Sequence, residues 1–250
     1  DDDSFARQAE RLIRDEHACV IIGCGTSVDR RSIVPVVERA DHLIVQPGAY
    51  EGLEQSPAVV CTGAVPNQQI APAVQWCHDA LSARRFLLVG TDDVWPRCIN
   101  AIAADQIRGV GDEVVAEISL QPGGTAVEDA VRRVVDLAPD VVLCSLTGDA
   151  AAAFFGRLRA AGVRADAMPV LAFGLAEDDL RAMDIDDLVG HYSAASYFQS
   201  VDRPENLAFV RRFKARYGAD RATSAAGVGG YDGVRLWAQA VREVETTDTR

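Results

Sequence analysis

Short apolar runs alternate with amphipathic helical segments along the chain, and this alternation constrains the fold more than any other feature. Strands are predicted at residues 18–22, 42–45, 59–62, 86–89, 114–120, 141–146, 169–173 and 190–198. Helices are predicted at residues 3–15, 30–39, 68–81, about 94–108, from about 125 onward, 149–162, 202–217 and 223–244. Such regular alternation is typical of a parallel sheet with helices on both faces. The sequence therefore predicts an α/β fold.

The ends of the predicted helices give more local expectations. Thr125 and Glu128 have the spacing of a capping box, and Asp149 is a candidate cap for the next helix. The first half of the last helix carries glycines that predict close packing or a bend, namely Gly227, Gly229 and Gly230. The same helix is expected to turn four apolar residues inward, namely Tyr231, Val234, Trp237 and Val241. The last helix is thus predicted to pack closely on the fold.

The charge balance and the cysteines narrow the classes of function. The 250 residues carry a net charge of −12, which disfavours binding to nucleic acid or to an anionic membrane surface. No apolar run approaches the roughly 18 residues that span a bilayer, and the opening DDDSFARQ lacks the pattern of a secretory signal. The six cysteines form no CxxC pair and no zinc-site spacing. We therefore expect buried, reduced thiols, no metal site and a reducing compartment.

The stretch from Phe86 to Asn100, FLLVGTDDVWPRCIN, predicts a buried strand, a tight turn and the start of a helix. Open α/β sheets present ligand-binding groups at such turns, because free N–H groups and the helix dipole converge at the carboxyl end of the strand. Asp93 and Trp95 place a fixed charge beside a large apolar surface at this turn. The alternative is that Thr91 or Asp92 only caps the helix while Trp95 fills the core.

The turn GCGTS after the first predicted strand has the first half of a dinucleotide-binding fingerprint. Val28 stands where the third glycine should be, which disfavours a nicotinamide cofactor. Ser27 either binds a small ligand together with adjacent N–H groups or only caps the following helix. The acidic group at 177–179 is interpreted as a helix start and a solvated face. Without GxSxG, HExxH or a histidine–carboxylate pair at short range, no catalytic constellation and no cofactor are predicted.

Several longer strings go beyond this general pattern. They are RRSIVPVVERAD (30–41), AYEGLEQSPAVVCTGAVPNQQ (49–69), LLVGTDDVWPRCIN (87–100), DVVLCSLTGD (140–149) and SYFQSVDRPENLAFVRRFKARYGAD (196–220). The most specific pieces are YEG, GAVPNQ and a DxxxPR pattern formed by Asp92, Pro96 and Arg97. On these motifs nearly the whole chain resembles the amide and urea branch of the type I periplasmic-binding proteins. That group includes urea-transporter receptors and the cytoplasmic amide-sensing regulator of amidase operons.

The resemblance implies a fold of two doubly wound parallel-sheet lobes that close on a ligand in the cleft between them. Residues 1–82 and 203–250 map to the first lobe, and residues 83–202 map to the second. Family members begin with a strand, a helix and a strand before the helix that opens this chain, and they continue past its last helix. The first lobe is therefore expected to be incomplete at both termini.

The ligand contacts of the family map onto nine residues of this chain, namely Gly25, Ser27, Gln46, Gly48, Ala49, Asp93, Trp95, Thr147 and Gly174. Ser27 matches the family, and Trp95 keeps its aromatic character. Family members carry aromatic rings, a hydroxyl or a proline at the positions of Gly25, Gln46, Gly48, Ala49 and Asp93. Either the pocket takes a ligand larger than acetamide or urea, or the cleft has decayed and the fold serves a partner. We favour an altered pocket, because Ser27, Asp93 and Trp95 form a coherent polar and stacking set.

The resulting hypothesis is a non-enzymatic solute-binding domain that closes on a small polar ligand, such as an amide, a urea or an amino-acid-like molecule. Trp95 stacks on the ligand, Ser27 and loop N–H groups satisfy its oxygen, and Asp93 satisfies its nitrogen. Occupancy is signalled to a transporter permease or to a regulatory protein, and a homodimer is a further option. A transporter receptor would be extracytoplasmic and a sensor cytoplasmic. The alternatives are a NAD- or flavin-dependent enzyme and an interaction domain with a degenerate cleft.

Overall fold

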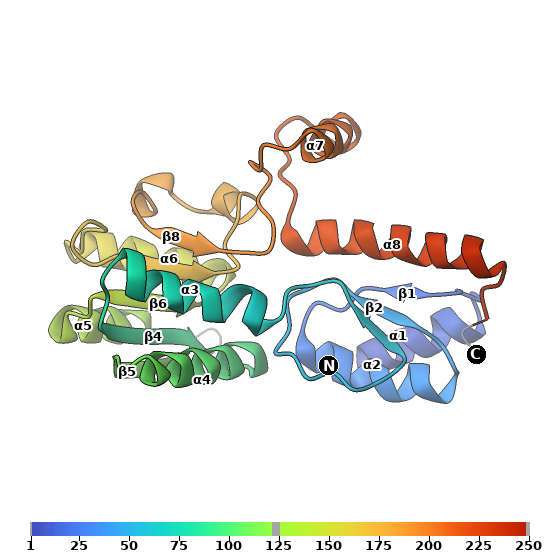
Figure 1. Ribbon diagram of the computed structural model, residues 1–250, viewed down its shortest axis with the longest axis horizontal. Helices are drawn as coiled ribbons and strands as arrows, with labels where there is room; N and C mark the ends of the chain where they lie inside the picture. The colour runs from blue at the N-terminus through green and yellow to red at the C-terminus, as the bar shows by residue number, and fades with distance from the viewer. Residues whose placement is uncertain (1, 122–125, 249–250) are drawn as a thin grey trace. The chain divides into compact units, whose positions relative to one another are not determined.

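The structure is a computed structural model that describes residues 2–121 and 126–248. The chain divides into two compact units, of which unit 1 contains residues 1–65 and 224–250 and unit 2 contains residues 66–223 (Figure 1). Each unit has a parallel sheet with helices packed against it. The predicted α/β class is therefore confirmed for both units.

Unit 1 is built on a short parallel sheet with the strand order β1-β2-β3 in the described residues. Its elements are β1 (Ile21–Ile22), β2 (Ile44–Gln46), β3 (Val59–Cys61), α1 (Asp2–Arg14), α2 (Ser27–Arg39) and α8 (Ala225–Val244). Figure 1 shows α8 on one side of these strands and α1 and α2 on the other. Ile33 and Val37 of α2 and Ile44 of β2 are among the buried residues of the core between α1, α2 and the sheet. The sheet is thus covered on both faces.

Unit 2 has a larger parallel sheet, with the order β5-β4-β6-β7-β8 in the part of the chain that the structure describes. The strands are β4 (Arg85–Thr91), β5 (Glu113–Leu120), β6 (Val141–Ser145), β7 (Val170–Phe173) and β8 (Tyr192–Ala194). The helices are α3 (Pro66–Ala80), α4 (Val94–Gly109), α5 (Val127–Leu137), α6 (Gly148–Ala160) and α7 (Pro204–Tyr217). Two 3₁₀ turns, η1 (Asp179–Ala182) and η2 (Ile185–Asp187), precede β8.

The central strand β4 shows why its sequence is apolar without interruption. Leu87 and Val89 belong to a core formed with α5 and α6, while Phe86 and Leu88 belong to a second core formed with α3 and α4. Successive side chains of a strand point to opposite faces of the sheet, so burial of both faces requires an apolar residue at every position. All four side chains are fully buried.

Of the two predictions for helix α8, close packing at its glycines is supported and the set of inward-facing apolar residues is partly wrong. Its glycines pack on the sheet as expected, because a Cβ added at Gly229 would lie 2.6 Å from the carbonyl oxygen of Pro47. A Cβ added at Gly233, one turn later, would lie 2.6 Å from a methyl carbon of Val45. The prediction that Tyr231 and Val234 point inward was wrong, since they are 36% and 49% exposed. Trp237 and Val241 are half-buried. The glycine face, rather than the most apolar face, lies on the strands.

Two helix caps predicted from the sequence are not found among the described residues. Thr125, the predicted partner of Glu128 in a capping box, lies outside the described residues, and the N-cap position of α5 is occupied by Ala126 without a side-chain hydrogen bond. Asp149 does not cap α6, because the helix begins one residue earlier, at Gly148, and Thr147 occupies the N-cap position. The strands β1 and β8 are shorter than the runs predicted at 18–22 and 190–198.

The compact units differ from the predicted lobes in two segments, 66–82 and 203–223. Helix α3 packs on α4 and β8, which groups it with unit 2. Asn206 of α7 donates a hydrogen bond to the carbonyl oxygen of Gln199 at 2.9 Å, which ties α7 to the segment that follows β8. The lobe boundaries themselves, after residue 82 and after residue 202, stay a prediction.

Candidate functional site

The carboxyl ends of the unit 2 strands carry four predicted site residues, namely Asp93, Trp95, Thr147 and Gly174. Strand β4 pairs in parallel with β5 on one side and with β6 on the other. The strand order therefore reverses between β4 and β6, and open α/β sheets bind ligands just outside the carboxyl ends of the strands at such a point. Asp93 and Trp95 follow β4, and Thr147 follows β6. The topology thus brings these residues to the edge where this fold binds ligands.

Asp93 is the N-cap residue of α4. Its side chain accepts a hydrogen bond from the N–H of Val94 at 2.6 Å, and the residue is exposed. The alternative that Thr91 or Asp92 caps the helix was wrong. Thr91 still belongs to β4, and the N–H of Asp92 continues the ladder by donating to the carbonyl oxygen of Leu120 at 2.7 Å. The chain becomes free to turn into the helix only at Asp93.

The DxxxPR motif joins the end of β4 to the first turn of α4. The Asp92 carboxylate accepts hydrogen bonds from Gln121 Nε2, at 2.6 Å, and from the guanidinium of Arg97. The hydrogen bond from Gln121, followed by that from Arg97, holds the pKa of Asp92 below its ordinary value. Pro96, between the two charged residues, is buried. The motif therefore has a structural role in fixing the turn that carries Asp93 and Trp95.

Trp95 combines a packed ring with an unsatisfied polar atom. The ring is partly buried and packs against the core formed by α3, α4 and the sheet, as the core-filling interpretation expects. Its indole Nε1 is buried and has no hydrogen-bond partner among the described residues. A buried donor without an acceptor costs about 1–3 kcal/mol, and such exceptions in folded proteins need a specific explanation.

Thr147 and Gly174 occupy the neighbouring strand ends. Thr147 is exposed and makes no capping hydrogen bond through its side chain. Gly174 follows β7 with a φ of +90°, a left-handed conformation that glycine adopts without strain, and its N–H donates to the carbonyl oxygen of Ala194 at 3.1 Å. Gly174 therefore lies at the end of the ladder between β7 and β8.

In unit 1, Gly25 and Ser27 lie in the turn between β1 and α2. Gly25 is exposed, whereas Ser27 is 4% exposed. The alternative that Ser27 caps α2 was wrong, because Thr26 is the N-cap residue and forms a capping box with Asp29. Thr26 Oγ1 accepts from the N–H of Asp29 at 3.1 Å, and the Asp29 carboxylate accepts from the N–H of Thr26 at 2.9 Å. The helix therefore starts independently of the Ser27 hydroxyl.

Ser27 instead belongs to a buried ion-pair cluster that the sequence analysis missed. Its hydroxyl donates to Glu51, and the guanidinium of Arg30, which is 3% exposed, bonds Glu51 at 3.1 Å and Glu54 at 2.9 Å. The Tyr50 ring centroid lies 5.2 Å from Arg30 Cζ, within the range of a cation–π contact. The Arg30 cluster, as we call these five residues, contains the Tyr50 and Glu51 of the YEG motif.

The Arg30 cluster keeps its carboxylates ionised. Burial acts to raise the pKa of Glu51, but hydrogen bonds from Ser27 and the nearby Arg30 guanidinium bring the pKa below its ordinary value. The pKa of Glu54 is also lowered, since hydrogen bonds from Ser56 and Gln55 outweigh the opposing effect of burial. A hydroxyl has one hydrogen, and that of Ser27 is donated to Glu51. For Ser27 to donate to a ligand, the ligand must replace Glu51 as the acceptor.

Gln46 is the last residue of β2, the strand that pairs with β1, and Gly48 and Ala49 lie in the loop that follows. Gln46 is 1% exposed, and its Oε1 has no hydrogen-bond partner among the described residues. A Cβ added at Gly63 would lie 1.9 Å from the carbonyl oxygen of Gly48, so the loops after β2 and β3 touch through their backbones. Ala49 is exposed. This loop therefore offers a buried amide oxygen without a donor.

The polar groups of these residues are hydrogen-bonding groups. Gln46 of unit 1 carries a buried acceptor without a donor, and Trp95 of unit 2 carries a buried donor without an acceptor, among the described residues. The cysteines are free thiols, and burial raises the pKa of Cys24 to about 11 and the pKa of Cys77 and Cys144 to about 12. In the described part of the chain, no three or more His, Cys, Asp or Glu side chains gather as a metal site would require. No helix there is both long and apolar enough for a membrane span.

Comparison with known proteins finds a family match over the whole chain. The profile of a family described as periplasmic binding protein domain matches residues 1–250. A second comparison, with sequences, finds 43% identity over 61 residues to a limonene hydroxylase of Geobacillus stearothermophilus. That match spans 24% of this chain and 11% of the hydroxylase, so it concerns a small part of either protein.

Solved structures match over the whole chain. A solute binding protein of an ABC transporter from Rhodopseudomonas palustris BisB5, in complex with 3,4-dihydroxybenzoic acid, has a TM-score of 0.89 at 21% identity. A leucine binding protein from Thermotoga maritima MSB8 has a TM-score of 0.86 at 18% identity. Both matches cover 100% of this chain, and they cover 69% and 71% of the matched chains. At these identities the likeness establishes the fold.

Proposed function

Because the chain belongs to the periplasmic binding protein domain family, we propose that it is a non-enzymatic solute-binding domain for a small neutral amide or urea derivative. The loops at the carboxyl ends of both sheets contribute to binding, through the nine residues identified from the sequence. Amide and urea recognition is the finer part of this proposal, and the sequence motifs shared with the amide and urea branch support it.

The observation that carries the proposal is the pair of unsatisfied atoms on Gln46 and Trp95. In the described residues, three buried side-chain polar atoms have no hydrogen-bond partner, and two of them belong to residues that the family resemblance assigns to ligand binding. Gln46 Oε1 accepts from a ligand N–H, and Trp95 Nε1 donates to a ligand carbonyl oxygen. An amide or a urea carries both groups, so a single ligand type satisfies both residues.

Charge favours a neutral ligand over a carboxylate. Asp93 is exposed at the end of β4 and would repel a carboxylate, whereas it accepts a hydrogen bond from an amide N–H₂. Arg30, a buried cation near the first turn, already pairs with Glu51 and Glu54. Family members carry aromatic rings, a hydroxyl or a proline at five of the nine positions, Gln46 among them, and the residues of this chain leave room there for a ligand larger than acetamide or urea. The benzoate and leucine ligands named for similar structures therefore serve as comparison compounds rather than as the expected ligand.

We further propose that occupancy is reported by closure of the two lobes, 1–82 with 203–250 and 83–202, to a transporter permease or a regulatory protein. In either case the domain binds the solute without changing it. A domain whose cleft has decayed would instead bind no solute, and an enzyme would convert one. A ligand panel separates these options.

The panel contains urea, acetamide, butyramide and benzamide, with leucine and 4-hydroxybenzoate as comparison compounds. A ligand at 100 times its Kd stabilises the folded state by about 2.7 kcal/mol, which raises the melting temperature of a domain of this size by roughly 5–10 °C. We expect a shift with an amide and recovery of that amide unchanged after incubation. No shift with any compound would contradict the proposal.

Two substitutions of Asp93 separate its capping from its binding role. Asn and Asp are equally good N-cap residues, so Asp93→Asn should leave the melting temperature of the free protein nearly unchanged, whereas Asp93→Ala costs about 1 kcal/mol. Both variants should lose most of the shift caused by the amide. If Asp93→Asn keeps the full shift, Asp93 does not contact the ligand through its charge.

A further inference from the structure

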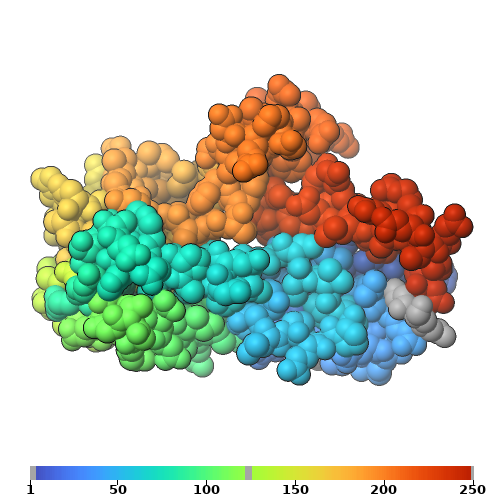
Figure 2. All heavy atoms as spheres, viewed as in Figure 1, coloured from blue at the N-terminus to red at the C-terminus, as the bar shows by residue number. Residues whose placement is uncertain are grey.

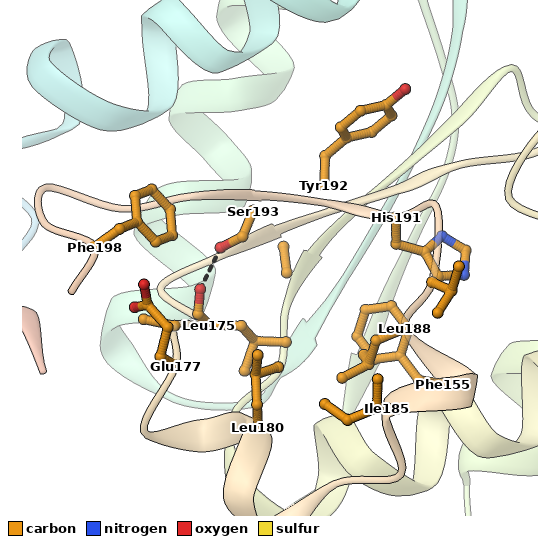
Figure 3. Close-up of a pocket in the computed structure, with 13 residues that line it drawn as sticks. Phe155, Leu175, Glu177, Leu180, Ile185, Leu188, His191, Tyr192, Ser193 and Phe198 are labelled. Atoms are coloured by element: carbon orange, nitrogen blue, oxygen red, sulfur yellow. Dashed lines mark hydrogen bonds between the residues drawn. The ribbon is translucent and has the colours of Figure 1, made fainter. Parts of the chain in front are cut away.

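Unit 2 holds a cavity of about 330 Å³ beside β7 and β8 (Figure 3). Its walls come from Phe155 of α6, the loop after β7, the turns η1 and η2, β8 and Phe198. The volume lies within the range of roughly 300–1,000 Å³ that is usual for small-molecule sites. None of the nine predicted ligand-binding residues lines this cavity. It is therefore separate from the site proposed above.

The walls of the cavity are mostly apolar, and some of them are left in contact with solvent. Phe155 and Leu175 are buried, with 1% and 5% of their surface exposed. Ile185 and Val189, which line the same cavity, are 53% and 69% exposed. Apolar side chains that stay exposed around a concave surface mark binding sites, because a bound apolar group removes them from water. The apolar body of a small ligand would cover both residues.

Glu177 adds a charge with an unfilled hydrogen-bonding position. Its Oε1 accepts from the N–H of Ser200 at 2.9 Å, whereas its Oε2 is buried and has no partner among the described residues. Burial acts to raise the pKa of Glu177, but the hydrogen bonds from the backbone, led by the N–H of Ser200, bring the pKa below its ordinary value. The group is therefore a carboxylate at neutral pH. A buried carboxylate oxygen without a donor is costly, so the cavity favours an occupant that donates to it.

Two other polar groups of the lining, on His191 and Ser193, already make hydrogen bonds. His191 Nδ1 accepts from the N–H of Val170 at 3.0 Å, and burial lowers the pKa of His191, which keeps the ring neutral. Ser193 Oγ donates its hydrogen to the carbonyl oxygen of Leu175, as the dashed line in Figure 3 marks. Figure 3 shows Glu177 and Phe198 on one side of the cavity, and Phe155, Leu188 and His191 on the other. The charge thus lies at one end of an apolar space.

We propose that this cavity is a second binding site, and that it takes a small primary amine with an aromatic or branched apolar body. The ammonium donates to Glu177 Oε2 and lies beside the ring of Phe198, where a cation gains from the π face. The apolar body fills the space toward Phe155 and Leu188. A carboxylate ligand is excluded by Glu177, and the net charge of −12 favours a cation over an anion.

The test uses 2-phenylethylamine as the probe and isothermal titration calorimetry on the full chain. Two compounds of similar shape serve as comparisons, 2-phenylethanol without a charge and 3-phenylpropionate with a negative charge. We expect saturable binding of the amine, at least tenfold weaker binding of the alcohol and no binding of the carboxylate. Absence of amine binding at millimolar concentration would overturn the proposal, and so would equal affinity for the amine and the alcohol.

Two variants locate the amine. Glu177→Gln keeps an oxygen for the N–H of Ser200 and removes the charge, so it should weaken amine binding at least tenfold while leaving the weak alcohol binding unchanged. Glu128→Gln is the matched control, because Glu128 is exposed on α5 and pairs with Arg157 at 3.1 Å, away from the cavity lining. Amine affinity that is equal in the two variants would overturn the assignment of Glu177.

Ile185→Lys provides a test that does not depend on Glu177. Ile185 is exposed, so the substitution should leave folding intact, and the new charge should repel the amine more than the alcohol. The amine should also bind Trp95→Phe as tightly as it binds the unmodified chain, because Trp95 does not line this cavity. Loss of amine binding in Trp95→Phe would place the amine in the other site and overturn the proposal. The proposed amine site can therefore be confirmed or contradicted independently of the proposed amide site.

Discussion

The loops at the carboxyl ends of the two sheets hold equivalent positions in the topology but are built differently. In unit 1, the side chains after β1 and β2 bond mainly to one another, as Ser27, Arg30 and Glu51 do. In unit 2, Asp93 and Thr147 are exposed after β4 and β6. The comparison shows that one set of loops is held by a largely buried polar cluster, whereas the other set leaves Asp93 and Thr147 exposed.

The sizes of the two sheets explain the difference. The described strands of unit 1 have two or three residues each, so their ladders contribute few hydrogen bonds and little apolar area. Unit 2 has strands of up to eight residues and an apolar core on each face of its sheet. A small sheet leaves its loops poorly anchored, and we infer that the Arg30 cluster compensates for this in unit 1. Substitutions in the two units should therefore affect different properties.

The largest effect is expected from Arg30→Ala. This change removes the buried guanidinium from the largely buried carboxylates of Glu51 and Glu54 and leaves only the exposed Arg31 beside Glu51, and breaking a buried pair costs about 3–5 kcal/mol. Urea denaturation measures the loss. The matched control is Arg31→Ala, because Arg31 also pairs with Glu51 but its side chain is 63% exposed, for which less than about 1 kcal/mol is expected. Equal losses in the two variants would show that burial of the Arg30 cluster does not matter.

A smaller effect is expected where α8 crosses the strands of unit 1. Gly229→Ala places a methyl group against the carbonyl oxygen of Pro47 and should destabilise by about 1–3 kcal/mol, the usual cost of overpacking. Gly230→Ala meets Pro47 only at an ordinary contact distance of 3.9 Å, and it should stabilise by up to about 1 kcal/mol through helix propensity. Thermal unfolding of the two variants should thus shift in opposite directions. A shift in the same direction would mean that the glycine face does not set the packing of α8.

The smallest expected effect is on the pH dependence of stability, which has different sources in the two units. Burial lowers the pKa of His191 in the folded state, so protonation favours the unfolded state. Stability from this source is complete above the unfolded value of 6.5 and declines as pH falls from there through the folded pKa. Glu51 and Glu54 in unit 1 contribute stability above 4.5 that is lost at lower pH, because their folded pKa values are also lowered.

The variant His191→Asn tests the first of these pH ranges. The amide oxygen of asparagine can accept from the N–H of Val170, as His191 Nδ1 does, but it does not titrate. The decline in stability between pH 6.5 and 5 should therefore be smaller in the variant, while the loss below pH 4.5 should remain. An unchanged decline above pH 5 would assign it to other groups. Urea denaturation at a series of pH values measures both ranges.

Much of the fold follows from local sequence patterns. The alternation of apolar runs and helical segments predicted the parallel α/β class, and the uninterrupted apolar run of β4 predicted a strand buried on both faces. Local patterns failed where tertiary contacts decide which face of a helix is buried. The apolar residues Tyr231 and Val234 suggested the buried face of α8, but Gly229 and Gly233 let the backbone of the helix approach the strands more closely.

The candidate sites were less predictable than the fold. Asp93 and Trp95 were found because they follow a recognisable strand. The Arg30 cluster was missed because Arg30 and Glu54 are 24 positions apart and meet only in the folded chain. The charged residues in and next to the YEG motif were the sequence signal that could have indicated this cluster. Glu177 was interpreted as part of a solvated acidic face, and only the structure shows that one of its oxygens is buried beside an apolar cavity.

The central claim is that Gln46 and Trp95 carry unsatisfied atoms because a ligand satisfies them. Gln46→Leu and Trp95→Phe each remove such an atom; leucine is close in size to glutamine, whereas phenylalanine keeps an aromatic ring but is smaller than tryptophan. When free, Gln46→Leu should be at least as stable as the unmodified chain, since a buried unsatisfied group is costly, whereas in Trp95→Phe the lost ring packing offsets this gain. Both should also bind the best amide of the panel at least tenfold more weakly by isothermal titration calorimetry. Full amide affinity in both variants would contradict the claim.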